Sequence, residues 1–158
     1  MIRIGQGFDV HQLAPGDGVT LGGLWVPCAH RIVAHSDGDI VLHALMDAML
    51  GSLALGDIGA LFPDTDPRFK GADSAELTRH VRALCLGKGY SPSNVDLTIL
   101  CETPKIGPVR EAMRQCVADV LEMPLDAVSV KASTTERLGF VGRGEGIAVM
   151  AVCLMHSH

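Results

Sequence analysis

Aromatic side chains are scarce in this sequence: they supply 4% of its 158 residues, whereas hydrophobic residues as a whole supply 47%. Leucine, valine, alanine, isoleucine and methionine must therefore fill the interior, which predicts an aliphatic and closely layered core. Long apolar runs are also missing, and none reaches the roughly 18 residues that a membrane-spanning helix requires. We therefore expect a globular protein that does not cross a membrane.

Positive charge is in short supply, with 13 Lys and Arg against 18 Asp and Glu and a formal net charge of −5. Binding to a nucleic-acid backbone needs a clustered positive field, so this balance argues against a nucleic-acid partner. An acidic protein that binds a phosphorylated ligand must instead concentrate positive charge locally, through metal ions, helix N-termini or a few placed Lys and Arg side chains.

The 5 cysteines are odd in number and never adopt C-x-x-C spacing. Neither a disulfide framework nor a thiolate zinc site is therefore indicated, and buried free thiols in a reducing compartment fit this usage. The alternating run Ile2-Arg3-Ile4 at the start leaves no room for a signal or transit peptide. We therefore expect a cytoplasmic protein.

The length suits one domain, and we expect residues 1–158 to form a single one. Alternation predicts a strand over 2–13 and a strand pair around 20–21 and 24–26 that turns at Gly22-Gly23. Apolar periodicity and end signals predict helices over 40–55, 74–89 and 108–122, and strands over 95–101, 128–131 and 147–154. Residues 56–73, rich in Gly, Pro and Asp, have the composition of a long loop.

This order of elements predicts an α+β fold, which we take to be a ferredoxin-like sandwich with a mixed four-stranded sheet, helices on one face and an N-terminal hairpin extension. The helix over 40–55 is apolar on nearly every side except at His43 and Asp47. We therefore expect its burial against the sheet and against a second partner, such as another subunit.

A candidate metal site begins at Asp9-Val10-His11, because residues two apart on a strand face the same side and present a carboxylate and an imidazole together. His43 adds a second imidazole one turn into the first helix, although a core histidine bonded to a backbone carbonyl is the simpler explanation of that residue alone. Asp47, one helical turn later, is placed to accept the second ring N–H of His43. Two His and one carboxylate match the ligand number of catalytic zinc, which keeps a position open.

A second candidate site lies between Lys131 and Gly146, where hydroxyls and glycines suit close contact with phosphate oxygens. Glu136 in this run is suited to a hard cation such as Mg²⁺, but a glycine-rich hairpin with a solvated Glu explains the segment equally well. The helix that starts just after Ser36 directs its N-terminal amides toward an anion, which suits a bound phosphate group.

Three cations are candidates for local positive charge: Lys105, Lys131 and Arg143. Lys105 ranks first among them, because Lys131 could equally be an outward-facing strand residue.

The run Ser36-Asp37-Gly38-Asp39, followed by His43 and Asp47-Ala48, resembles the signature of the 2-C-methyl-D-erythritol 2,4-cyclodiphosphate synthase family. Further segments resemble family motifs in family order, so that the resemblance covers essentially the whole chain. These segments are Gly7-Phe8-Asp9-Val10-His11, Leu55-Gly56-Asp57-Ile58-Gly59, Phe62-Pro63-Asp64-Thr65-Asp66-Pro67, Pro104-Lys105 and Thr134-Thr135-Glu136 through Gly146.

The resemblance implies a homotrimer with active sites between subunits, which converts 4-diphosphocytidyl-2-C-methyl-D-erythritol 2-phosphate to the cyclic 2,4-diphosphate and releases CMP. It implies Zn²⁺ on Asp9, His11 and His43, and a second divalent cation, Mg²⁺ or Mn²⁺, on Glu136. His35 and Thr134 match positions credited with stabilising the transition state. The substrate-binding residues implied in this way are Asp9, His11, His35, Ser36, Asp57, Ile58, Gly59, Phe62, Pro63, Asp64, Thr65, Asp66, Cys101, Glu102, Thr103, Pro104, Lys105, Ile106, Gly107, Ser133, Thr134, Thr135, Glu136, Phe140 and Arg143.

Two other functions stay open at this stage. A metal-dependent phosphohydrolase would use the same open metal position to activate water. A non-enzymatic carrier is the second alternative, because the axis of such a trimer could enclose an apolar channel for an isoprenoid ligand.

Overall fold

The computed structural model describes residues 1–158, and its main feature is a five-stranded mixed sheet in the order β4-β1-β7-β5-β6. β5 and β6 run parallel, whereas the other neighbours run antiparallel. A separate two-stranded sheet pairs β2 with β3. The strands are β1 (Ile2–Pro15), β2 (Gly18–Leu21), β3 (Leu24–Pro27), β4 (His30–Val33), β5 (Tyr90–Leu100), β6 (Val128–Ser133) and β7 (Gly146–Ser157).

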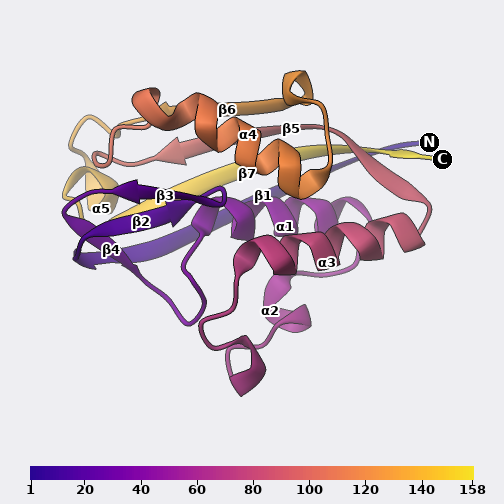
Figure 1. The fold of residues 1–158 in the computed structure, drawn as a ribbon, viewed down its shortest axis with the longest axis horizontal. Helices are drawn as coiled ribbons and strands as arrows, with labels where there is room; N and C mark the ends of the chain where they lie inside the picture. The colour runs from indigo at the N-terminus through magenta and orange to yellow at the C-terminus, as the bar shows by residue number, and fades with distance from the viewer.

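Three long helices lie on one side of the main sheet, with the ends of the chain side by side at one edge of the view (Figure 1). They are α1 (Ile40–Ser52), α3 (Ser74–Gly87) and α4 (Arg110–Leu121). The shorter helices are α2 (Ile58–Leu61) and α5 (Gly139–Gly142), together with 3₁₀ turns at Pro67–Phe69, Gly107–Val109 and Leu125–Ala127. None of these helices has the length and apolar character needed to span a membrane.

The predicted α+β class, with helices on one face, is confirmed, but the prediction of four strands in the sheet was wrong. The fifth strand, β4, is four residues long and pairs with the end of β1 from Gln12↔Val33 to Pro15↔His30. Such a short segment carries too little alternation to be detected, and its pairing with β1 makes it a strand. The main elements run β-α-α-β-α-β-β, so the ferredoxin-like order β-α-β-β-α-β is not confirmed.

Element boundaries differ from expectation at the ends. The predicted strand pair that turns at Gly22-Gly23 is confirmed, and both glycines adopt positive φ. α1 ends at Ser52, three residues before the predicted end, and β5 begins at Tyr90, five residues before the predicted start. The predicted loop over 56–73 contains α2 and a 3₁₀ turn, each begun by an aspartate that accepts a main-chain N–H.

The backbones of β1 and α1 approach each other closely. A Cβ built on Gly5 would lie 1.8 Å from the main-chain oxygen of Ala48, and one built on Gly7 would lie 1.8 Å from that of Ala44. The two glycines therefore let the helix backbone rest directly on the strand. This approach sets the height of α1 above β1, and with it the position of the residues that follow Gly7.

α1 is buried along almost its whole length, as its apolar sequence predicted. It contacts β1 and β7 on the sheet side and α3 on the other side. The second partner is thus α3 of the same chain, and the suggestion that another subunit covers this helix was wrong. Within one chain the helix already meets its need for two apolar neighbours.

The opposite face of the sheet is apolar and has no cover. Ile2, Ile4 and Phe8 on β1 are 70%, 69% and 57% exposed, and Val10 and Val152 are also exposed. Monomeric proteins rarely leave so contiguous an apolar surface in water. This face is therefore the part of the molecule best suited to a protein contact.

Asp39 joins three elements at the start of α1. Its carboxylate accepts N–H groups from Leu42 in the first turn, at 3.1 Å, and from Gly22 and Gly23 in the hairpin turn, at 2.8 and 2.6 Å. Asp39 is fully buried, and burial raises its pKa to about 6, against the effect of these main-chain hydrogen bonds. The carboxylate both caps α1 and holds the β2–β3 hairpin against it.

Candidate metal centre and phosphate site

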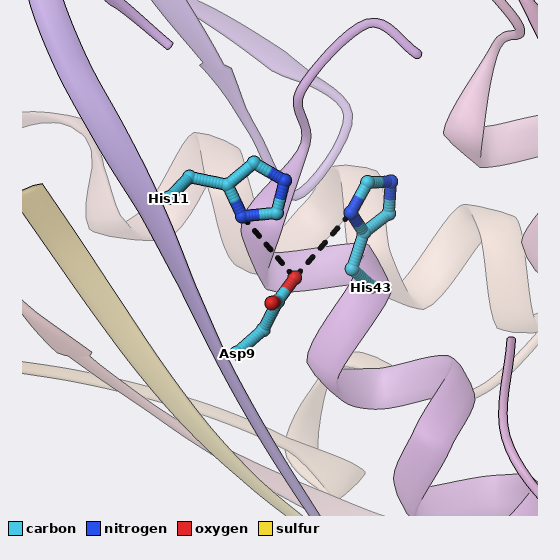
Figure 2. Close-up of side chains that lie close together, drawn as sticks. All are labelled: Asp9, His11 and His43. Carbon is cyan, nitrogen blue, oxygen red and sulfur yellow. Dashed lines mark ion pairs between the residues drawn. The ribbon is translucent and has the colours of Figure 1, made fainter. Parts of the chain in front are cut away.

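Asp9, His11 and His43 meet between β1 and α1 (Figure 2). Oδ2 of Asp9 lies 3.3 Å from Nδ1 of His11 and 3.4 Å from Nδ1 of His43. One potential ligand atom from each residue lies within 4.8 Å of the other two. The predicted convergence of these side chains is therefore confirmed, and the glycines before Asp9 explain how the helix comes near enough to supply His43.

The surroundings of His11 suit a cation. Burial lowers the pKa of His11, although the nearby Asp9 carboxylate acts in the opposite direction, so the imidazole is neutral at pH 7. Nδ1 of His11 is buried and has no hydrogen-bond partner, because its 3.3 Å approach to Asp9 lacks hydrogen-bond geometry. A buried nitrogen lone pair beside a carboxylate oxygen is costly unless a cation satisfies both. The donor set of two imidazoles and one carboxylate thus fits a divalent metal with an open position.

The ring of His43 is held from the side opposite Asp9. Its Nε2 lies 2.9 Å from Oγ of Ser74 and 3.1 Å from Oγ of Ser36. The prediction that Asp47 accepts from this ring nitrogen was wrong, because Oδ1 of Asp47 instead accepts the main-chain N–H of Ile58 at 2.8 Å. Burial raises the pKa of Asp47, and its hydrogen bond ties α1 to the segment that enters α2.

Ser74 is a site residue that the sequence did not reveal. It begins α3, is fully buried and lies 31 residues from His43 along the chain. Its position at a helix start gave a capping signal, but nothing in the spacing pointed to an imidazole. Only the packing of α3 against α1 brings the two side chains together.

The candidate metal ligands open into a cavity of about 390 Å³. Nε2 of His35 is a second buried nitrogen here without a hydrogen-bond partner, which leaves it available to a ligand. The predicted site residues that line this cavity are Asp9, His11, His35, Ser36, His43, Ile58, Gly59, Phe62 and Asp64. Residues on the lining that were not predicted are Val10, Gln12, Val33, Ala34, Met46, Phe69 and Leu77.

A second cavity, of about 420 Å³, lies beside the end of β6. The predicted site residues that line it are Cys101, Pro104, Lys105, Ile106, Gly107, Ser133 and Thr134, and Pro108, Arg110 and Ala132 complete the lining. The two cavities share no lining residue within one chain.

Of the three candidate cations, Lys105 alone lines a cavity and makes no ion pair. Nζ of Lys131 lies 2.6 Å from Oδ2 of Asp96, and Nε of Arg143 lies 2.6 Å from Oε1 of Glu145. Lys131 is therefore the outward-facing strand residue that the sequence left as an alternative. Lys105 is the best placed of the three to meet a negatively charged ligand.

Glu136 sits in an unusual turn after β6. Glu136 and Arg137 both adopt positive φ, at 54° and 62°, which costs non-glycine residues about 1–3 kcal/mol each. Oγ1 of Thr134 accepts the N–H of Glu136 at 3.3 Å, and Oε1 of Glu102 accepts the N–H of Arg137 at 3.1 Å. Such strain is typical of functional turns, and Glu136 does not belong to the Asp9, His11 and His43 cluster of the single chain.

The remaining predicted residues line neither cavity of the single chain: Asp57, Pro63, Thr65, Asp66, Glu102, Thr103, Thr135, Glu136, Phe140 and Arg143. Asp57 caps α2, and Asp66 caps the 3₁₀ turn while it pairs with Arg68 at 2.6 Å. Asp39 caps α1 and accepts the N–H of Leu42, so this amide is not free for an anion. Phosphate binding by the other amides at the start of α1 stays a prediction.

The fold and the site together define an α+β protein with a candidate divalent-metal centre that opens into a ligand cavity. The chain belongs to the YgbB family, which it matches over residues 2–156.

Known relatives span nearly the same length. A Pseudomonas paraeruginosa protein named 2-C-methyl-D-erythritol 2,4-cyclodiphosphate synthase is 60% identical over 154 residues, which cover 98% of each chain. A solved structure of 2C-methyl-D-erythritol-2,4-cyclodiphosphate synthase with CDP bound has a TM-score of 0.90 and 37% identity, over 98% of this chain and 100% of that one. The Plasmodium falciparum IspF complex with CDP has a TM-score of 0.87 and 36% identity, over 99% and 96%.

Proposed function

We propose that the chain is a 2-C-methyl-D-erythritol 2,4-cyclodiphosphate synthase, a cyclising phosphorus–oxygen lyase. It converts 4-diphosphocytidyl-2-C-methyl-D-erythritol 2-phosphate to 2-C-methyl-D-erythritol 2,4-cyclodiphosphate and CMP. The observation that carries this proposal is the Asp9, His11 and His43 centre beside His35 and Ser36, in a chain 60% identical to a synthase of that name.

The reaction consumes no water. An oxygen of the 2-phosphate forms a bond to the β-phosphorus, the bond from that phosphorus to the oxygen bridging to CMP breaks, and CMP leaves with the electron pair. Such a transfer asks the protein for positioning and charge neutralisation more than for covalent chemistry. Two phosphate charges about 4 Å apart repel by roughly 4 kcal/mol at an effective dielectric of 20, which the site must offset.

We assign the 2-phosphate to His35 and Ser36. Oγ of Ser36 accepts the main-chain N–H of Gly38 at 3.2 Å and lies 3.1 Å from Nε2 of His43. A hydroxyl whose lone pairs face these groups keeps its own proton for an outside acceptor, such as a phosphate oxygen. The unpartnered Nε2 of His35 supplies a second contact from the same cavity.

We assign two divalent cations to the site. Asp9, His11 and His43 hold Zn²⁺, which suits two imidazoles and one carboxylate, and Glu136 binds Mg²⁺ or Mn²⁺, which suits a carboxylate together with substrate phosphates. Bound at these residues, the ions supply Lewis acidity at phosphoryl oxygens and neutralise the charge on the leaving group.

We place the cytidine end of the substrate in the cavity lined by Lys105. Residues 101–107 supply five of its 10 lining residues, and Ser133 and Thr134 also line it. Thr134 then joins His35 as a residue that stabilises the transition state. Support comes from the Plasmodium falciparum relative, which is described in complex with CDP.

We propose a homotrimer with each active site between two subunits. The two cavities share no residue within one chain, so one substrate that spans both needs the second from a neighbour. The exposed apolar sheet face that holds Ile4 and Phe8 supplies the contact, and its apolar side chains would line the trimer axis, where they suit an isoprenoid ligand. Light scattering of the purified protein tests the trimer, and a monomeric mass at micromolar concentration would contradict it.

We further propose that residues 1–158 form one domain, to which the β2–β3 hairpin is an extension held by Asp39. A cytoplasmic location agrees with the five cysteines, all of which are free thiols.

The activity is tested by incubation with the cytidine substrate and ³¹P NMR of the products. The expected result is the cyclic diphosphate and CMP in equal amounts. Linear phosphate products in place of the cyclic one would favour the phosphohydrolase, and binding without turnover would favour the carrier. His43→Ala should abolish turnover and zinc binding while the oligomer still forms, and retained zinc in that variant would contradict the assigned ligand set.

A further inference from the structure

A chain of hydrogen bonds, buried between His43 and Ser74, runs from the candidate metal ligand His43 to the loop before α1. Nε2 of His43 lies 2.9 Å from Oγ of Ser74, whose hydroxyl reaches Oδ1 of Asp37. Oδ2 of Asp37 also accepts the main-chain N–H of Ser74 at 2.9 Å. His43 is 8% exposed and Ser74 is fully buried, so water competes little for the contact between them, whereas Asp37 is an exposed residue.

The direction of the chain follows from donor and acceptor chemistry. A carboxylate oxygen accepts hydrogen bonds, so the hydroxyl proton of Ser74 is committed to Asp37. Oγ of Ser74 then meets Nε2 of His43 with a lone pair, and the contact is a hydrogen bond only when Nε2 carries the proton. In a neutral imidazole the other nitrogen is then unprotonated.

That other nitrogen, Nδ1, is the atom that lies 3.4 Å from Oδ2 of Asp9. A metal ligand must present a lone pair, so the tautomer that Ser74 selects is the one that the cluster needs. Ser36 does not reverse this choice: its Oγ accepts the N–H of Gly38 and can also accept from Nε2 at 3.1 Å. With the opposite tautomer, the lone pairs of Ser74 and Nε2 would face each other at 2.9 Å.

We infer that Asp37 and Ser74 are positioning residues for the metal centre: they fix the tautomer and the ring orientation of His43 so that Nδ1 is free for the metal. The inference rests on the proposed metal site, and it assigns the second residue of the Ser36-Asp37-Gly38-Asp39 run to holding His43. It also gives the junction of α1 with α3 a part in metal binding.

The first test needs no variant. ¹⁵N NMR of the imidazole groups in the metal-free protein reports which ring nitrogen of His43 carries the proton at neutral pH. The expected state is protonation at Nε2. Protonation at Nδ1 would overturn the inference, whatever the metal affinity of the protein.

The second test compares zinc affinities, measured by competition with a chromophoric chelator. Ser74→Ala removes the acceptor and should weaken zinc binding about 10–100-fold, whereas Asp37→Asn keeps an acceptor oxygen and should weaken it less. Thr78→Val is the matched control, because Thr78 is also a buried hydroxyl on α3 but donates to the carbonyl of Ser74 at 2.7 Å and makes no hydrogen bond to His43. Thr78→Val should bind zinc as the wild type does.

The outcomes separate this inference from the proposed function. Zinc affinity in Ser74→Ala equal to that of Thr78→Val would overturn the positioning role and leave the metal site intact. A wild-type protein that binds no zinc would overturn the metal site itself. If Ser74→Ala fails to fold, the tautomer of His43 in the wild type decides.

Discussion

The substitution Gly7→Ala tests how the site is assembled, although Gly7 touches no ligand. The glycine lies on β1 beneath α1, two residues before Asp9, and its missing side chain leaves room for the backbone at Ala44, next to His43. A single added methyl group should therefore separate the strand and the helix that share the three candidate ligands.

The geometry sets the size of the effect. The new Cβ would lie 1.8 Å from the main-chain oxygen of Ala44, whereas non-bonded atoms settle at about 3.5 Å. Because that oxygen belongs to the helix backbone, α1 must move by more than about 1 Å, whereas metal sites tolerate about 0.2 Å. We expect a loss of about 1–3 kcal/mol in the free energy of unfolding and of at least about 100-fold in zinc affinity.

The assay is urea unfolding of the metal-free protein together with chelator competition for zinc. Gly51→Ala is the control: Gly51 lies on the same helix, and a Cβ there would come no closer than 3.9 Å to another atom. That substitution should leave zinc binding unchanged and raise stability by up to about 1 kcal/mol. Wild-type zinc affinity and stability in Gly7→Ala would refute the view that this close approach places His43.

Three further predictions concern acidic residues. The pKa of Asp39 is raised by burial from 3.8 to about 6, so the folded state holds a proton over that range that the unfolded chain has lost. The free energy of unfolding of the metal-free wild type, relative to that of Asp39→Asn, should therefore fall by up to about 3 kcal/mol as pH rises from 4 to 6. Urea unfolding measures both proteins, and a difference between them that stays constant over this pH range would contradict the prediction. Asp47→Asn should leave zinc affinity within about twofold of the wild type, because Asp47 binds Ile58 and not His43, and a loss of about tenfold or more would contradict the assignment. Glu136→Gln should lower turnover by about 100-fold with zinc content unchanged, and loss of zinc would show that Glu136 belongs to the Asp9 cluster.

The metal cluster was predictable because each of its parts follows from a local period. Asp9 and His11 share a strand face by the two-residue repeat, and His43 falls on a helix whose caps and apolar residues mark it clearly. Pattern reasoning could not supply the approach of α1 to β1. Gly5 and Gly7 carry that information, but a glycine in a strand indicates close contact without naming the partner.

The residues around His43 show where local reasoning fails. Asp47 lies one helical turn from His43, which is the correct spacing for a contact, yet its carboxylate accepts the N–H of Ile58 from the segment after α1. The contact with Nε2 of His43 that was expected from Asp47 is made by Ser74, which lies on a different helix. Tertiary packing decides whether a residue near in sequence or a distant one forms the hydrogen bond to His43, and this packing cannot be deduced from a single sequence.

The sheet shows the same limit. Strands with long alternating runs, such as β1 and β7, were recognised, whereas the four-residue β4 depends on the edge of β1 for its hydrogen bonds. The separation of the two cavities was equally hidden, because it depends on how the turn after β6 lies relative to α1. Motif order along the chain does not reveal which segments share a cavity.

The most direct measurement is a crystal structure of the protein with zinc and CDP, with anomalous diffraction recorded at the zinc edge. We predict a peak at about 2.0–2.2 Å from one atom each of Asp9, His11 and His43, with the remaining coordination position facing the cavity that holds His35. A zinc peak at other residues would contradict the assigned metal site. CDP density without a zinc peak at Asp9, His11 and His43 would contradict it as well.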